Sequence, residues 1–185
     1  MMENATECLP ADVKLAASRE FRCTPASEAE RKRLGLWFKR SDAQPTGAYA
    51  KAGEAFEIKV IGGPAGATLE AVVGTYGYGG FIQKDTEEPR TYKLSRGPNE
   101  IRDAVGGVVW IRAVSDGESA VQGSTSIEIT GSGIQRIPVY RQGETRPADW
   151  PQMLEDSEMK GERSPVQLVG EHTVLTVWRA SALAN

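Results

Sequence analysis

The sequence predicts a mainly β protein, an antiparallel β-sandwich of about eight strands with an N-terminal helix and one short helix near residues 147–155. Twenty Gly and ten Pro among 185 residues imply many turns. Short apolar segments recur at roughly even spacing between these turns, which is typical of a sandwich. We expect an irregular lead-in over 1–24, a helix over 25–40 and the β-sandwich domain over 41–185.

The helix is predicted from its start signal and its apolar side chains. Ser27 is followed three residues later by Glu30, which is the spacing of a capping box. Leu34, Trp37 and Phe38 then give the segment one apolar face. The residues before it show no clear periodicity, so we expect them to be irregular.

The strands are predicted from alternation and from turn residues. Phe56 to Val60 alternates strictly between apolar and polar residues, the pattern of a half-buried strand. Val108 to Ile111 is a continuous apolar run that suits a sandwich core. Pro45-Thr46-Gly47 and Gly97-Pro98-Asn99 are turn signals. The other expected strands are 48–50, 69–73, 91–94, 127–129, 137–140, 166–168 and 174–178, and a short helix carrying Trp150 falls between the last groups.

Composition excludes several classes of function. The net charge is −3 and no Lys/Arg cluster stands out, so we expect no nucleic-acid partner. No apolar run approaches the roughly 18 residues of a membrane span. The first ten residues lack an apolar core, so no signal peptide is visible.

Two interpretations of localisation stay open, a cytoplasmic protein or an internal piece of a longer secreted one. Cys8 and Cys23 are correspondingly either free thiols or a disulfide formed in an oxidising compartment.

Counting histidines excludes the commonest zinc-peptidase motif from this chain. His172 is the single histidine, whereas HExxH needs two imidazoles one helical turn apart. Cys8, Cys23 and His172 lack the paired spacing of a structural zinc site. We therefore predict no catalytic and no metal-binding residue here, and interpret His172 as a surface residue at a strand start.

A glycine-rich segment, Gly74 to Gly80, is a candidate ligand-binding feature. It lacks the Lys-Ser/Thr of a P-loop and does not match GxGxxG. Its aromatic residues Tyr76 and Tyr78, together with Phe81, are suited to stacking on sugar rings or on a peptide partner. Packing within the loop explains them equally, so both interpretations stay open.

An ordered set of motifs from Ser41 to Trp178 resembles the N-terminal part of the enhancin-like family, Peptidase_M60. The resemblance covers about three quarters of the chain. The residues that carry it are Gln44-Pro45-Thr46-Gly47-Ala48-Tyr49, Ala52-Gly53-Glu54 before Phe56 to Val60, Gly97-Pro98-Asn99-Glu100-Ile101, Gly106-Gly107-Val108-Val109-Trp110-Ile111, Ile127 to Gly131, Ile137-Pro138-Val139-Tyr140-Arg141-Gln142-Gly143, Thr145, Trp150 and Val174-Leu175-Thr176-Val177.

The resemblance implies a sandwich from a zinc metallopeptidase that cleaves heavily glycosylated proteins such as mucins, usually outside the cell. Family members carry their zinc ligands and catalytic glutamate C-terminal to this sandwich, and this sequence stops before them. It implies that zinc belongs to the missing catalytic part, that the main partner is the catalytic domain of the same longer chain, and that a glycoprotein or glycan is a further partner. As part of such a chain, the protein would be secreted or at the cell surface. The alternative is a free-standing glycan- or glycoprotein-binding module without peptidase activity.

Overall fold

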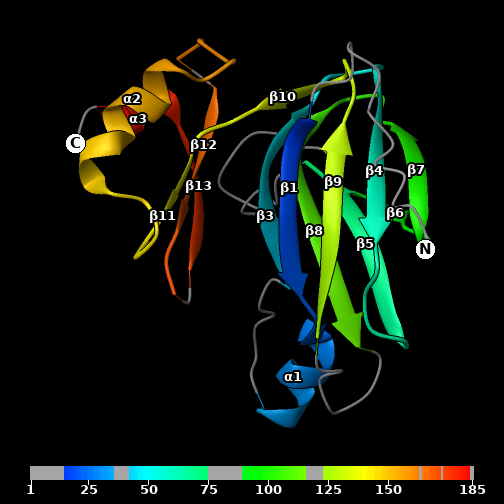
Figure 1. Cartoon of the computed structure of the whole chain (residues 1–185). Coiled ribbons are helices and arrows are strands. Elements are labelled where there is room, and N and C mark those ends of the chain that lie inside the picture. The colour runs from blue at the N-terminus through cyan, green and yellow to red at the C-terminus, as the bar shows by residue number, and fades with distance from the viewer. Residues whose placement is uncertain are drawn as a thin grey trace, which may run out of the picture.

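The computed structural model describes residues 15–35, 42–74, 89–115, 123–162, 164–171 and 173–183. Two sheets face each other and form the sandwich, and a third, smaller sheet lies beside them with two short helices (Figure 1). The predicted fold class, a mainly antiparallel β-sandwich, is confirmed. The described residues form 13 strands rather than about eight, because several expected turns are part of strands and the lead-in contributes a strand of its own.

The first sheet of the sandwich is entirely antiparallel. Its strand order is β1 (Leu15–Arg22), β9 (Ser124–Thr130), β4 (Ala55–Ile61) and β7 (Gly97–Arg102). Strand β1 corrects the prediction of an irregular lead-in over 1–24. It pairs with β9 from Leu15 opposite Thr130 to Arg22 opposite Ser124, and Phe21 is buried in the core. The sequence did not reveal this strand because its apolar residues do not alternate, and the pairing with β9 holds it in place.

The second sheet packs across the first. Its strand order is β10 (Ile134–Arg136), β3 (Ala43–Ala50), β8 (Gly107–Ser115), β5 (Ala67–Val73) and β6 (Arg90–Lys93), and the two-residue strand β2 (Thr24–Pro25) pairs with β8 in parallel. The core between the sheets is mainly aliphatic. Ile58, Ile127 and Ile129 of the first sheet and Val109 and Ile111 of the second are fully buried.

The third sheet consists of β11 (Val139–Arg141), β12 (Pro165–Val169) and β13 (Val174–Trp178). Strands β11 and β12 pair in parallel, an exception to the predicted antiparallel arrangement. The 3₁₀ turn η1 (Pro147–Asp149) and helix α2 (Trp150–Glu155) confirm the expected short helix near 147–155, and helix α3 (Arg179–Leu183) follows β13. None of the described helices is long and apolar enough to cross a membrane.

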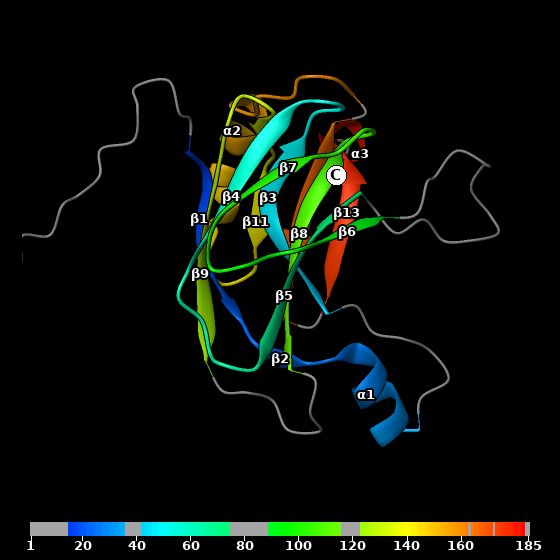
Figure 2. The same cartoon turned by 90° about the vertical axis from the view of Figure 1, so that its right-hand side faces the viewer.

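The N-terminal helix is shorter than expected. Helix α1 is Ser27–Arg33 and lies beyond the ends of the sandwich strands (Figures 1 and 2). The capping-box prediction is wrong, because no side chain caps the helix and the N-cap residue is Ala26. The Ser27 N–H instead donates to the Asp42 carboxylate at 3.0 Å. Trp37 and Phe38, expected on its apolar face, are outside the described residues.

Two expected turns lie inside strands. Pro45-Thr46-Gly47 is the middle of β3, where the register with β8 shifts between Pro45 and Ala48. This β-bulge uses the positive φ of Gly47, +78°, which explains why the segment has the composition of a turn. Gly97-Pro98-Asn99 begins β7, which is an edge strand, and an edge strand tolerates proline.

Candidate functional site

The glycine-rich segment belongs to the connection between β5 and β6 of the second sheet. Gly74 directly follows β5, and Arg90 is the first residue of β6. Tyr76, Tyr78 and Phe81, the candidate ligand-binding residues, fall in 75–88 and lie outside the described residues. The structure therefore shows how the base of this segment is held, and the role of its three aromatic residues stays a prediction.

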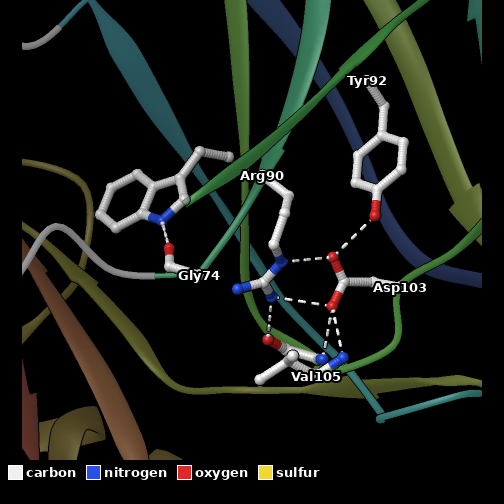
Figure 3. A network of polar contacts seen from close by, with 7 residues as sticks. Gly74, Arg90, Tyr92, Asp103 and Val105 are labelled. Carbon is white, nitrogen blue, oxygen red and sulfur yellow. Dashed lines mark hydrogen bonds and ion pairs between the residues drawn. The ribbon is translucent and has the colours of Figure 1, made fainter. Parts of the chain in front are cut away.

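One end is held by a buried carboxylate, that of Asp103, in the turn between β7 and β8 (Figure 3). Arg90 donates to it through Nε at 2.8 Å and through Nη2 at 2.7 Å, and the Tyr92 hydroxyl donates at 2.7 Å. The N–H groups of Val105 and Gly106 donate at 2.9 and 2.6 Å. Arg90 Nη2 also donates to the Gly106 carbonyl at 2.7 Å, so β6 is tied to the β7–β8 turn at several points.

The donors around Asp103 keep it ionised. Burial alone would raise its pKa, but hydrogen bonds from Arg90, Tyr92 and two backbone N–H groups outweigh burial and lower the pKa to about 2. Burial and the bond to Asp103 raise the pKa of the Tyr92 phenol. Neither group is poised to exchange a proton near neutral pH, so the cluster is a structural anchor rather than an acid–base site.

The other end is held by Trp110 of β8, whose side chain lies on the outer face of the second sheet. Its indole Nε1 donates to the Gly74 carbonyl at 2.8 Å (Figure 3). The Gly74 N–H donates to the Val108 carbonyl at 2.9 Å. Gly107 lies so close that a Cβ on it would be 2.8 Å from the Gly74 Cα. Gly74 and Arg90, which flank 75–88, are thus both fixed to the sheet.

Sequence reasoning did not find this anchor. Arg90 and Tyr92 both lie in β6, whereas Asp103 follows β7, so they meet only when β6 lies beside the β7–β8 turn. One local signal was available, because an Asp three residues before Gly106 is typical of a turn in which the carboxylate accepts backbone N–H groups.

A second feature is an open cavity of about 370 Å³ beside the bulge of β3. Arg19 and Arg136 line it, but Arg19 pairs with Glu144 at 3.2 Å and Arg136 with Glu158 at 3.5 Å. Because both guanidinium groups already have carboxylate partners, the cavity is poorly suited to bind an anion.

The residues that the structure describes do not fit a zinc centre. They contain no group of three or more His, Cys, Asp or Glu placed to hold a metal ion. Cys23 is a free, buried thiol whose pKa is raised by burial, which disfavours the thiolate that zinc requires. His172 and Cys8 are outside the described residues, and one histidine cannot form HExxH.

Two facing sheets joined by a mostly buried aliphatic core place the chain among the β-sandwich proteins. A family described as the N-terminal domain of M60-like peptidases matches residues 21–130, more than half of the chain, and the protein belongs to this family. The resemblance to enhancin-like peptidases is thereby confirmed. No curated protein matches the chain.

Solved structures share this fold over about nine tenths of the chain. A conserved protein of unknown function from Bacillus anthracis is 24% identical, with a TM-score of 0.71, over 91% of this chain and 32% of its own. The catalytic module of the metalloprotease ZmpA from Clostridium perfringens is 19% identical, with a TM-score of 0.69, over 92% of this chain and 36% of its own. A metallopeptidase in complex with Tn antigen is 18% identical, with a TM-score of 0.75, over 91% of this chain and 30% of its own. The chain thus spans about a third of the length of these structures.

Proposed function

We propose that this chain is the non-catalytic sandwich portion of an enhancin-like zinc metallopeptidase that acts on mucin-type glycoproteins. It packs against the catalytic part of such a peptidase, which holds the zinc, and contributes to substrate contact. The observation that carries this proposal is the family match over residues 21–130. The proposed setting is a secreted or cell-surface enzyme.

The chemistry of the chain supports a supporting role rather than a catalytic one. The single histidine rules out HExxH within these residues. In the polar cluster around Asp103, the carboxylate oxygens accept hydrogen bonds from five donor groups. Such a saturated cluster stabilises a framework and leaves no group to activate water.

The segment 75–88 is the proposed point of substrate contact. The residues on either side of it are tied to the sheet, Arg90 by an ion pair with Asp103 and Gly74 by a hydrogen bond from Trp110. A fixed base lowers the entropy lost when a segment binds. Tyr76, Tyr78 and Phe81 then supply aromatic faces of the kind that stack on sugar rings, and a metallopeptidase of the same fold has been solved with a glycan antigen.

A hybrid protein tests the leading proposal. In it, this chain replaces the portion of the Clostridium perfringens ZmpA catalytic module that it matches. We expect the hybrid to cleave a mucin-type glycoprotein in a zinc-dependent manner. The unmodified ZmpA module is the positive control. A folded hybrid that is inactive while the control cleaves would contradict a supporting role for this sandwich.

The alternative, a free-standing glycan-binding module, is favoured by the same aromatic segment and has its own test. The chain is passed over immobilised mucin, together with a variant carrying Tyr76→Ala, Tyr78→Ala and Phe81→Ala. Leu34→Ala, which removes an exposed apolar side chain elsewhere, is the matched control. Retention lost only in the triple variant supports binding through 75–88. If the unmodified chain is not retained on immobilised mucin, it is not a free-standing glycan-binding module.

A further inference from the structure

The third sheet has an open edge at β13. Its strand order is β11-β12-β13, and within the described ranges β13 pairs only with β12. In Figure 1 this sheet lies beside the sandwich, next to α2 and α3. The family match ends at residue 130, whereas the structural matches cover nine tenths of the chain and therefore continue into this sheet.

The register shows which backbone groups of β13 point to the open edge. Gly170 donates to the Thr173 carbonyl and Arg179 to the Ser164 carbonyl, each at 2.8 Å, which marks hydrogen-bonded pairs at both ends of the β12–β13 ladder. Such pairs alternate along an antiparallel ladder, so Leu175 and Val177 bond to β12. The intervening residues Val174, Thr176 and Trp178 direct their N–H and C=O groups outward.

The position of Pro165 agrees with this assignment. Pro165 lies opposite Trp178, in a pair that is not hydrogen-bonded across β12 and β13. Proline has no N–H, so it fits only where the ladder needs no donor.

The composition of β13 differs from that of the sandwich edges. The edge strands β1, β6 and β7 all carry charged residues, and β7 also carries Pro98. Charges, proline and bulges are the usual protection of a sheet edge against further pairing. The sequence of β13, VLTVW, has no charge and no proline, and its register with β12 is unbroken. Leu175 and Trp178 are 51% and 55% exposed.

We propose that the open edge of β13 pairs with an extended strand from the catalytic part of the peptidase, which continues the third sheet and covers Trp178. This inference rests on the proposed function. The solved structures that share the fold run to about three times the length of this chain, so they contain further polypeptide that can supply the strand. Strand addition satisfies the outward N–H and C=O groups and buries the exposed apolar side chains in one step.

Amide hydrogen exchange on the 185-residue chain and on the ZmpA hybrid tests the pairing. In the chain alone, we expect Leu175 and Val177 to be protected and Thr176 and Trp178 to exchange rapidly. In the hybrid, exchange at Thr176 and Trp178 should slow by about 100-fold or more, because these amides become hydrogen-bonded. Iodide quenching of Trp178 fluorescence should fall in parallel.

Two proline variants separate the open edge from the paired edge. Thr176→Pro removes an outward N–H, so it should lower the melting temperature of the hybrid more than that of the chain alone. Val177→Pro removes an N–H that bonds to β12, so it should lower both. Equal effects of Thr176→Pro on the two proteins would overturn the proposal.

The remaining outcomes are also decisive. Rapid exchange at Thr176 in the hybrid overturns the pairing, and so does a hybrid whose two parts unfold separately. Protection of Thr176 in the chain alone, with a mass that rises with concentration, would show a second copy on the edge and also overturns it. A hybrid that cleaves glycoprotein with Thr176 unprotected keeps the proposed function and loses this inference. A hybrid in which Thr176 is protected but glycoprotein is not cleaved keeps this inference and contradicts the proposed function.

Discussion

At the scale of single residues, Asp103 is a buried charge that serves stability. Its side chain is fully buried and accepts hydrogen bonds from Arg90, Tyr92 and two backbone N–H groups. We expect Asp103→Asn to lower the free energy of unfolding by about 2–4 kcal/mol, because it removes the buried charge that Arg90, Tyr92 and two backbone N–H groups all bond to. Urea denaturation at neutral pH measures the change. Glu144→Gln is the control, since that carboxylate is largely exposed and pairs with Arg19, so it should cost about 0.5 kcal/mol or less.

The same carboxylate predicts a pH dependence. Its pKa is lowered from 3.8 to about 2 in the folded state, so the unfolded state binds the proton more readily. The contribution is therefore complete above about pH 4 and is lost as the pH falls toward 2, amounting to about 2 kcal/mol. The stability gap between wild type and Asp103→Asn should narrow over this window. A gap that is constant from pH 7 to pH 2 would contradict the assignment.

Substituting two glycines that share a similar backbone conformation distinguishes the cost of backbone strain from the cost of steric overlap with neighbouring atoms. Gly106 has φ +76° and Gly53 has φ +72°. A Cβ on Gly106 would lie 2.8 Å from the Ala52 nitrogen, whereas a Cβ on Gly53 would meet nothing within 4 Å. We expect Gly53→Ala to cost about 1 kcal/mol and Gly106→Ala clearly more, measured by thermal unfolding. Equal costs would mean that the close packing of the β7–β8 turn against residues 50–52 is wrong.

At the scale of elements, the bulge of β3 depends on one buried hydroxyl. Thr46 Oγ1 donates to the Val109 carbonyl at 2.5 Å and accepts from the Ala48 N–H at 3.1 Å. Thr46→Val keeps the side-chain shape but leaves both backbone groups unsatisfied, so we expect a loss of about 1–3 kcal/mol in chemical denaturation. Thr91→Val, on the exposed face of β6, should change stability by less than about 0.5 kcal/mol. If Thr46→Val and Thr91→Val change the free energy of unfolding by the same amount, the Thr46 hydroxyl does not stabilise the bulge.

The sequence predicted elements where local pattern and tertiary contacts agree. Phe56 to Val60 alternates, and its apolar residues are buried as β4 requires. The local pattern did not predict elements whose conformation is set by pairing with a distant strand. The sequence of β1 does not alternate between apolar and polar residues, and the strand is held in place by hydrogen bonding to β9. Pro45-Thr46-Gly47 has the composition of a turn, although it forms a bulge inside β3.

At the scale of the whole molecule, the fold class and the family could be predicted, but the separation of the third sheet could not. Val166 to Leu168 and Val174 to Trp178 were recognised as strands and assigned to the sandwich. Short apolar runs do not specify their partners, so nothing local indicated that β12 pairs with β11 and β13 with β12 in a sheet of their own. The anchor around Asp103 was missed for a related reason, since its members meet only through the arrangement of β6, β7 and β8.

We propose that these residues support a peptidase whose catalytic centre lies in other residues. The most direct measurement is mass spectrometry of a mucin-type glycopeptide bearing Tn antigen after incubation with the 185-residue chain and zinc, with the ZmpA catalytic module as the positive control. Because the chain has one histidine and cannot form HExxH, the glycopeptide should remain intact with this chain while the control cleaves it. Zinc-dependent cleavage by the chain itself, abolished by a chelator, would show that these residues hold a catalytic centre of their own and would overturn the proposed supporting role.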